Sequence, residues 1–203
     1  KKYFGKKILE VGAGIGSFTN IYKNKKLQIN LTEIDNNNFE ILKTKFSDSK
    51  EIKVEKKYTH QINEKFDTIL YLSVLEHIEE DKKEINEAIN KLDSNGHLII
   101  CVPAHNYMYS NFDREIGHFR RYEESFFKKL SFNNATLKKT FFIDSFGYLL
   151  YFFNKLMFSK EVYPSKLKVL VWDKIFIPLT YFLDFITFYK VGKNIICIFK
   201  KYF

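Results

Sequence analysis

Residues 8–16, which read I-L-E-V-G-A-G-I-G, place an acidic side chain directly before a run of alternate glycines. The glycines are Gly12, Gly14 and Gly16, and Ala13 lies between the first two. Glycine has no Cβ, so its backbone can approach a ligand closely and can adopt angles that other residues avoid. A helix predicted to begin near Ser17 would aim its free N–H groups at the same space. The pattern predicts a ligand-binding loop between a buried strand and a helix, with a nucleotide as the expected ligand.

An acidic side chain after the second predicted strand could hold the sugar of such a ligand. The stretch L-T-E-I-D ends in Asp35, whose carboxylate can accept hydrogen bonds from both hydroxyls of a ribose. Glu33, two residues earlier on the same side of an extended strand, is the alternative. A dinucleotide-dependent enzyme would use the same acid, so Asp35 alone does not identify the cofactor.

Two features of the glycine loop argue against a nicotinamide dinucleotide. Ser17 stands where the dinucleotide pattern places its third glycine. Glu10 would repel a pyrophosphate, whereas it would attract a cationic ammonium or sulfonium group. An NAD-dependent enzyme is therefore the weaker alternative.

The composition excludes several other classes of protein. The net charge of +9 favours anionic partners, but lysines are interleaved with acidic residues, which predicts a solvated surface and no dedicated nucleic-acid module. Cys101 and Cys197 each lie inside an apolar run, so we expect core residues, no metal site and a reducing, cytoplasmic setting. We expect no signal peptide, and the sequence contains no clean apolar run of about 20 residues.

Strand and helix signals alternate over the first two-thirds of the 203 residues. This alternation predicts one α/β domain whose parallel sheet is covered by helices on both faces and binds ligands at the carboxyl ends of its strands. The predicted strands are Lys7–Val11, Leu27–Thr32, Ile52–Glu55, Thr68–Leu72 and His97–Val102. The predicted helices are Ser17–Lys23, Asn37–Phe46 and Lys82–Leu92, the last of them closed by a turn over Asp93–Gly96.

The last third of the chain is rich in aromatic residues. Two further strands are predicted, Thr140–Asp144 and Asn194–Phe199, with a helical insertion over residues 146–190 between them. The insertion could pack as a cap over the active cleft. Alternatively, it could contact a membrane surface or hold an apolar substrate.

Five motifs in register resemble those of class I S-adenosylmethionine-dependent methyltransferases. They are E-V-G-A-G-I-G, L-T-E-I-D, F-D-T-I-L, L-E-H-I and N-G-H-L-I-I-C-V-P. The resemblance covers most of the chain. It implies a Rossmann-like, seven-stranded sheet with an antiparallel last strand, and S-adenosyl-L-methionine as the cofactor, with its methionine end near Glu10, Gly12 and Ser73. Relatives often bind adenine with an acid after the third strand; here Tyr58 could stack on the adenine instead.

The segment Asp113–Tyr122 fits the pattern D-x-x-x-G-H-[FY]-R-R-Y. This pattern resembles one bacterial and archaeal subgroup of these enzymes, often encoded near glycosyltransferases. Forked arginine side chains suit phosphate or carboxylate, so we expect Arg120, Arg121 and Tyr122 to bind an anionic part of the acceptor. Pairing of an arginine with Asp113 or Glu123 is the alternative.

Two histidines are candidates for a general base if the acceptor is a hydroxyl. An unperturbed histidine titrates near physiological pH, and His118 lies in the loop expected to overhang the cleft. His77 follows the fourth strand, beside the expected cofactor. Either ring could instead serve only to brace its loop.

The sequence therefore predicts a methyltransferase for a small-molecule or glycan acceptor, with O-methylation favoured. An RNA or protein methyltransferase, suggested by the positive charge, is one alternative. A catalytically silent scaffold of the same fold is another.

Overall fold

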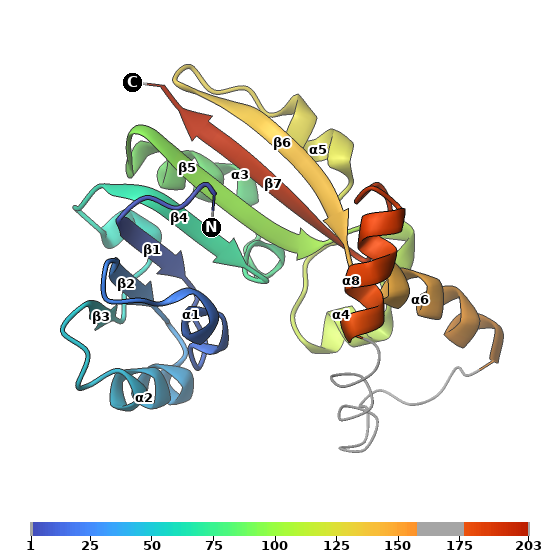
Figure 1. Ribbon diagram of the computed structural model, residues 1–203, viewed down its shortest axis with the longest axis horizontal. Helices are drawn as coiled ribbons and strands as arrows, with labels where there is room; N and C mark the ends of the chain where they lie inside the picture. The colour runs from blue at the N-terminus through green and yellow to red at the C-terminus, as the bar shows by residue number, and fades with distance from the viewer. Residues whose placement is uncertain (1, 158–176, 203) are drawn as a thin grey trace.

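A computed structural model of the chain, described for residues 2–157 and 177–202, contains a seven-stranded sheet with the order β3-β2-β1-β4-β5-β7-β6 (Figure 1). The strands are β1 Lys7–Val11, β2 Gln28–Thr32, β3 Ile52–Glu55, β4 Phe66–Leu72, β5 Leu92–Pro103, β6 Ala135–Ile143 and β7 Asn194–Lys201. The helices are α1 Ser17–Tyr22, α2 Asn36–Lys45, α3 Asp81–Asn90, α4 Asn111–Glu115, α5 Glu124–Lys129, α6 Ser145–Met157 and α8 Ile177–Ile186. Short 3₁₀ turns are η1 Thr59–Gln61, η2 Leu75–His77 and η3 Asn106–Met108.

The sheet is parallel from β3 to β5 and becomes antiparallel at β7. Strand β1 pairs in parallel with both β2 and β4, so the strand order reverses direction at β1. Strand β7 lies between β5 and β6 and is antiparallel to both. The predicted Rossmann-like sheet with an antiparallel last strand is confirmed.

Alternate residues of each central strand pack on opposite faces of the sheet. In β1, Leu9 joins a core under α3 and α5, whereas Ile8 joins a core under α1 and α2. The same division separates Ile69 from Leu70 in β4. Because strand side chains alternate between faces, near-continuous apolar strands require helices on both sides of the sheet. This packing holds the carboxyl ends of the strands at one edge.

The start of β5 differs from the prediction. The turn expected over Asp93–Gly96 is part of β5, and α3 ends at Asn90. Pairing with β4 jumps from Leu92 to His97, so the intervening polar residues form a bulge, and Asn95 has a φ of 64°. Polar residues and glycine are common both in β-bulges and in turns, so the sequence pattern alone could not distinguish a bulge from a turn here.

The end of the chain departs from the prediction in the lengths of its elements. The strand expected over Thr140–Asp144 extends back to Ala135 in β6, whose register shifts near Lys139 and so breaks the sequence alternation. Helices α4 and α5 were not predicted. The insertion over 146–190 contributes α6 and α8; its residues 158–176 lie outside the described residues. In the described parts of the chain, no helix has the length and hydrophobicity needed to cross a membrane.

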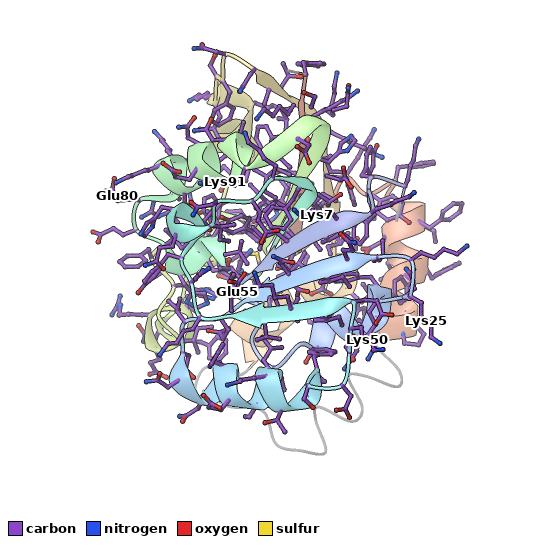
Figure 2. The ribbon with its side chains drawn as sticks, turned by 90° about the vertical axis from the view of Figure 1, so that its left-hand side faces the viewer. Lys7, Lys25, Lys50, Glu55, Glu80 and Lys91 are labelled. Atoms are coloured by element: carbon purple, nitrogen blue, oxygen red, sulfur yellow. The ribbon has the colours of Figure 1, made fainter. Side chains whose placement is uncertain are left out.

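The positive charge is distributed over many elements. The labelled lysines in Figure 2 come from β1, from loops near α1 and β3, and from the end of α3. Several lysines pair with acids: Lys7 lies 2.9 Å from Glu64, and Lys53 lies 3.0 Å from Glu55. Exposed pairs of this kind contribute little to stability, but they keep positive charge from accumulating in one patch.

The core packing of β7 leads to a stability prediction. Phe199 is fully buried, and its ring centroid lies 5.8 Å from that of Phe132. Replacing Phe199 with Ala should lower the free energy of unfolding by about 3–5 kcal/mol, because it removes a buried aromatic ring and leaves a cavity. Urea unfolding measures the change. The matched change Phe188→Ala, at a side chain that is 77% exposed, should stay within about 0.5 kcal/mol; equal losses would contradict the packing.

Candidate active site

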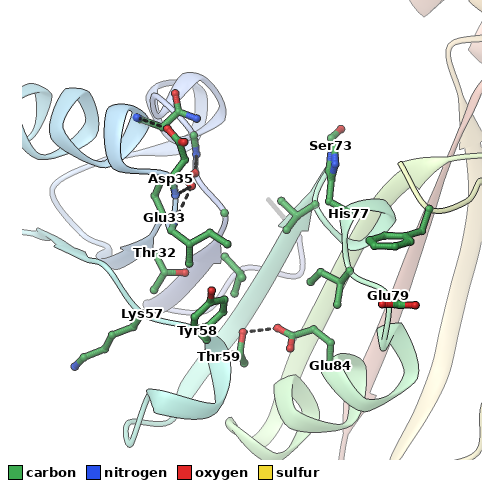
Figure 3. Close-up of a pocket in the computed structure, with 18 residues that line it drawn as sticks. Thr32, Glu33, Asp35, Lys57, Tyr58, Thr59, Ser73, His77, Glu79 and Glu84 are labelled. Carbon is green, nitrogen blue, oxygen red and sulfur yellow. Dashed lines mark hydrogen bonds between the residues drawn. The ribbon is translucent and has the colours of Figure 1, made fainter. Parts of the chain in front are cut away.

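A cleft of about 710 Å³ opens at the carboxyl ends of the parallel strands (Figure 3). Its walls come from the segments that follow β1, β2, β3 and β4, together with Phe119 from the loop after β5. The lining includes Gly12, Gly14, Glu33, Asp35, Asn38, Tyr58, Thr59, Ser73, Val74, His77 and Glu84. Cavities of this size take small ligands and cofactors, and the edge where strand order reverses is the expected location.

The glycine loop forms the floor of the cleft in a conformation that suits glycine. Gly12 and Gly14 have φ values of 63° and 55°, in the left-handed region. A Cβ on Gly12 would lie 2.8 Å from the Val74 side chain, so Gly12 allows the β1 and β4 loops to meet. A Cβ on Gly14 would meet no atom of the described chain within 4 Å and would instead occupy space at the cleft. The backbone at Gly14 is thus open to a ligand.

The Glu33 carboxylate joins the β1 loop to the β2 loop. Its Oε2 accepts the backbone N–H of Gly14 at 2.8 Å, and its Oε1 accepts those of Ile34 and Asp35, each at 2.8 Å. Glu33 is buried. Its oxygens are therefore used to shape the loops, and Asp35 is the better placed of the two predicted sugar ligands.

Three other predicted ligand residues line the same cleft. Asp35 is exposed and caps α2, its Oδ1 accepting the Asn38 backbone N–H at 2.9 Å. Tyr58 is 54% exposed and stacks on His60 with a centroid distance of 5.6 Å. Ser73 follows β4 with a φ of 59°. The structure brings these residues together, and their contacts with a cofactor stay predictions.

Glu10 points away from the cleft. Its Oε2 accepts hydrogen bonds from Thr19 at 2.6 Å and from Tyr22 at 2.5 Å, both on α1. Burial raises the pKa of Glu10, although these two donors oppose the shift. Gly16 and Ala13 also lie outside the cleft lining of the described residues. The predicted contact between Glu10 and the cofactor is untested; in this structure its carboxylate holds α1 against β1.

A polar group on the β3 side of the cleft was not found from the sequence. The hydroxyl of Thr59 donates to Oε1 of Glu84 at 2.5 Å (Figure 3). The hydroxyl of Tyr71 donates to the same oxygen at 2.6 Å. Thr59 and Glu84 line the cleft, whereas Tyr71 is buried behind them. Glu84 lies in the first turns of α3. From the sequence alone, a charged residue there is expected to face solvent. Only the folded structure shows that Glu84 lies opposite Thr59 and belongs to the cleft.

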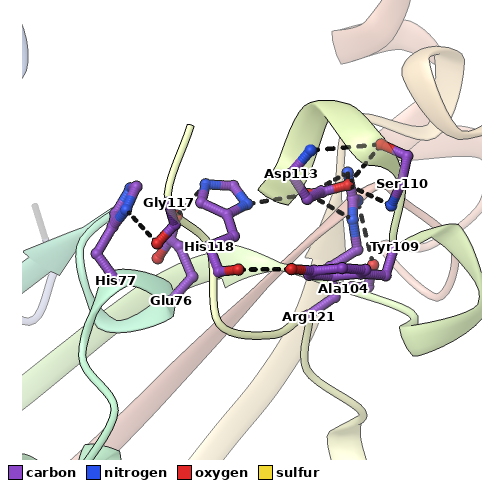
Figure 4. Close-up of polar contacts among 9 residues, drawn as sticks. All are labelled: Glu76, His77, Ala104, Tyr109, Ser110, Asp113, Gly117, His118 and Arg121. Carbon is purple, nitrogen blue, oxygen red and sulfur yellow. Dashed lines mark hydrogen bonds and ion pairs between the residues drawn. The ribbon is translucent and has the colours of Figure 1, made fainter. Parts of the chain in front are cut away.

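The two predicted histidines lie side by side (Figure 4). Their ring centroids are 4.7 Å apart at an angle of 73°. His77 is exposed and lines the cleft, and its Nδ1 lies 3.1 Å from the Gly117 carbonyl. Burial, followed by the charge of His118, lowers the pKa of His77. The His118 side chain is only 9% exposed and lies outside the cleft lining of the described residues.

Asp113 holds His118 and Arg121 in place. Its Oδ1 lies 2.9 Å from Nδ1 of His118 and accepts Nε–H of Arg121 at 2.9 Å, while its Oδ2 accepts the Ser110 hydroxyl and backbone N–H. Burial alone would raise the pKa of Asp113, but these hydrogen bonds and the Arg121 charge lower it well below its usual range. The alternative in which an arginine pairs with Asp113 is the arrangement observed.

The predicted acceptor ligands are engaged inside the protein. Arg121 is buried on Asp113, and Arg120 donates to Asp81 at 2.8 Å and to the Glu79 carbonyl. Tyr122 is buried, and its hydroxyl lies 3.1 Å from the Leu75 carbonyl and 3.0 Å from Asp81. These contacts brace the loop after β5 against η2 and α3, and the predicted role of the three residues at the acceptor stays a prediction.

Glu76 is the residue of this loop cluster that the sequence analysis missed. Its side chain is 1% exposed, and neither carboxylate oxygen has a hydrogen-bond partner among the described residues. Burial raises the pKa of Glu76 to about 7. A buried carboxylate without a partner is costly, so its place beside two imidazoles makes Glu76 a candidate functional residue.

The family of the chain follows from comparison with known sequences. The family model described as a methyltransferase domain matches residues 4–141, which include the glycine loop and the strands β1 to β5. The chain belongs to this family. It is an S-adenosylmethionine-dependent methyltransferase, and the open backbone at Gly14 fits that cofactor. No curated protein matches the chain.

Solved methyltransferases share the fold at low identity. A SAM-dependent methyltransferase from Archaeoglobus fulgidus is 16% identical with a TM-score of 0.59, over 98% of this chain and 89% of that one. NodS, an N-methyltransferase from Bradyrhizobium japonicum WM9 in complex with S-adenosyl-L-homocysteine, is 13% identical with a TM-score of 0.59, over 97% and 78%. Coclaurine N-methyltransferase, bound to N-methylheliamine and SAH, is 15% identical with a TM-score of 0.66, over 97% and 67%.

The position of Asp113 leads to a second stability prediction. Asp113→Asn removes the charge that compensates buried Arg121, so the free energy of unfolding should fall by about 3–5 kcal/mol. Chemical unfolding followed by circular dichroism measures it. Asp48→Asn, at an exposed position, serves as the matched control and should leave stability unchanged. A tolerated Asp113→Asn would show that this ion pair does not hold the loop.

Proposed function

We propose that this methyltransferase transfers a methyl group to a hydroxyl of a small-molecule or glycan acceptor. The observation that carries the proposal is that His77 lines the cleft with His118 packed against its ring and Glu76 next to His118. An oxygen acceptor must lose its proton during transfer, and these three side chains supply bases at that place. The acceptor would enter beside His77 and Phe119, which line the cleft.

The cofactor is proposed to lie along the β1 loop, with its methionine end toward Ser73. S-adenosylmethionine supplies a methyl group already activated on a sulfonium. The protein then has to position the acceptor and exclude water. Asp35 would hold the ribose hydroxyls and Tyr58 the adenine, while Gly12 and Gly14 let the backbone approach. These assignments are supported by the shared cleft that the residues line.

A hydroxyl group is favoured over an amine by the bases near His77. The second candidate is N-methylation, because several structural neighbours are named N-methyltransferases. An amine that arrives uncharged already has a free electron pair and needs less help from a base. The spare carboxylate and imidazoles therefore support an oxygen acceptor.

The glycan class of acceptor rests on the loop after β5. We propose that the chain belongs to the subgroup with the D-x-x-x-G-H-[FY]-R-R-Y pattern, and the way Asp113 organises His118 and Arg121 gives that pattern a structural reason. RNA and protein acceptors are less favoured, because the lysines lie on many elements.

Membrane contact through the 146–190 insertion stays a prediction. Helix α8 and the residues after it expose several aromatic side chains, among them Tyr181, Phe182, Phe185 and Phe188. The described residues of α6 and α8 do not line the cleft, which gives the predicted cap over the active site no support from this part of the insertion.

The ribose contact is tested by Asp35→Asn. Asparagine caps helices as well as aspartate does, so the fold should persist. Loss of hydrogen bonds to a charged acceptor, worth about 1.5–3 kcal/mol, should weaken binding of S-adenosylhomocysteine about 10- to 150-fold in isothermal titration. Glu40→Gln, which changes an exposed acid on the same helix, is the control. Unchanged affinity in Asp35→Asn would remove Asp35 from the cofactor site.

The acceptor class is tested with labelled S-adenosylmethionine and matched phenol, sugar and amine acceptors. We expect label in hydroxyl acceptors, and a fall of turnover by about 100-fold or more in His118→Asn, which can still hydrogen-bond to Asp113. Binding of S-adenosylhomocysteine should change little, because His118 lies outside the cleft lining of the described residues. His97→Asn is the histidine control. Transfer only to amines would favour N-methylation instead.

A further inference from the structure

Glu76, His77 and His118 present one potential ligand atom each to a single small space. These three atoms all lie within 4.8 Å of one another. Nε2 of His118 is 3.9 Å from Oε1 of Glu76. Neither oxygen of Glu76 has a hydrogen-bond partner in the described chain. Three side chains that can each donate an electron pair therefore surround this space. Among the described residues, none donates a hydrogen bond to the Glu76 carboxylate.

Nδ1 of each imidazole lies within hydrogen-bond distance of an acceptor oxygen (Figure 4). Nδ1 of His77 lies 3.1 Å from the Gly117 carbonyl, and Nδ1 of His118 lies 2.9 Å from the Asp113 carboxylate. Carbonyl and carboxylate oxygens only accept hydrogen bonds, so in each neutral ring Nδ1 carries the proton and Nε2 carries the lone pair. A histidine held in this way by a carboxylate or a carbonyl is the usual outer-sphere arrangement around a metal ligand.

We propose that Glu76, His77 and His118 bind one divalent metal ion of the zinc class beside the cleft. Two imidazole nitrogens and one carboxylate oxygen form the protein ligands of zinc sites that keep a further position open. Bonds of about 2.0–2.2 Å would require donor atoms roughly 3.0–3.5 Å apart, so the ligands must draw together slightly. His77 is exposed and can make that movement.

The burial of Glu76 favours a bare ion over a larger cationic group. Its side chain is 1% exposed, which leaves little room for a substituted ammonium at its oxygens. An ion would compensate the buried carboxylate, whose isolation is otherwise costly. It would also explain why Asp113, itself fixed by Arg121, is directed at the far nitrogen of His118.

The expected effect on the reaction rests on the proposed function, namely a hydroxyl acceptor. Next to the ion, the pKa of that hydroxyl would fall and its proton would pass to solvent water. The oxygen electron pair would then form the new O–C bond while the C–S bond breaks and its electrons stay on sulfur. With the ion bound, this route would replace proton transfer to His77 or His118, because their nitrogen lone pairs would hold the ion.

Metal binding is measured without turnover, on the tag-free full chain treated with chelator and then titrated with ZnCl₂ and CoCl₂. We expect one Zn²⁺ per chain, a visible absorption band from bound Co²⁺, and a rise in melting temperature with Zn²⁺. Glu76→Gln and His118→Asn should each weaken Zn²⁺ binding by at least about tenfold. His97→Asn and Glu115→Gln, which change a histidine on β5 and an exposed acid near the loop, should bind as the wild type does.

Absence of stoichiometric Zn²⁺ binding, or equal binding by wild type and Glu76→Gln, would overturn the inference. Binding of S-adenosylhomocysteine by each variant shows that its fold is intact. The proposed function is tested independently of the metal site, and it fails if only amines accept the methyl group. A protein that methylates hydroxyls yet binds no Zn²⁺ would therefore reject the metal site alone.

Discussion

The carboxylate of Glu33 fixes the loops on which the cleft depends. Parallel strands end with backbone N–H groups that need partners, and one buried carboxylate accepts three of them from two loops. Because one of these donors is Gly14 and another is Asp35, the glycine turn and the acidic strand end are held in a set relation. The cleft is thus shaped before any ligand arrives, which lowers the ordering cost of binding.

The sequence predicted the parts of the molecule that depend on local pattern. The predicted strands Lys7–Val11 and Ile52–Glu55 match β1 and β3. Strand β1 is buried on both faces and reads as a mostly apolar run, whereas the edge strand β3 alternates apolar and charged residues. The position of the cleft followed from topology, since the carboxyl ends of parallel strands share an edge. The glycine loop and Asp35 lie at that edge for the same reason.

The parts that the sequence did not predict depend on contacts between distant segments. The sequence analysis did not predict that the Glu10 side chain points toward α1, although Glu10 lies on the same strand face as Ile8, which packs under α1. For Arg121 the sequence left open a contact with the acceptor or a pairing with Asp113, and only the folded loop after β5 shows the pairing. Nothing in L-E-H-I marks Glu76 as buried without a partner; only the packing of the loop after β5 over η2 shows it.

The connection between β6 and β7 leaves the sheet and returns to it at the same point, because Ile143 pairs with Asn194. The register of the two strands is therefore independent of how much chain lies between them. A change in the length of this excursion would therefore leave the pairing of β6 and β7, and the cleft after β1 to β4, in place. Such a modular joint would let related enzymes acquire new acceptors or attachment surfaces without rebuilding their common catalytic half.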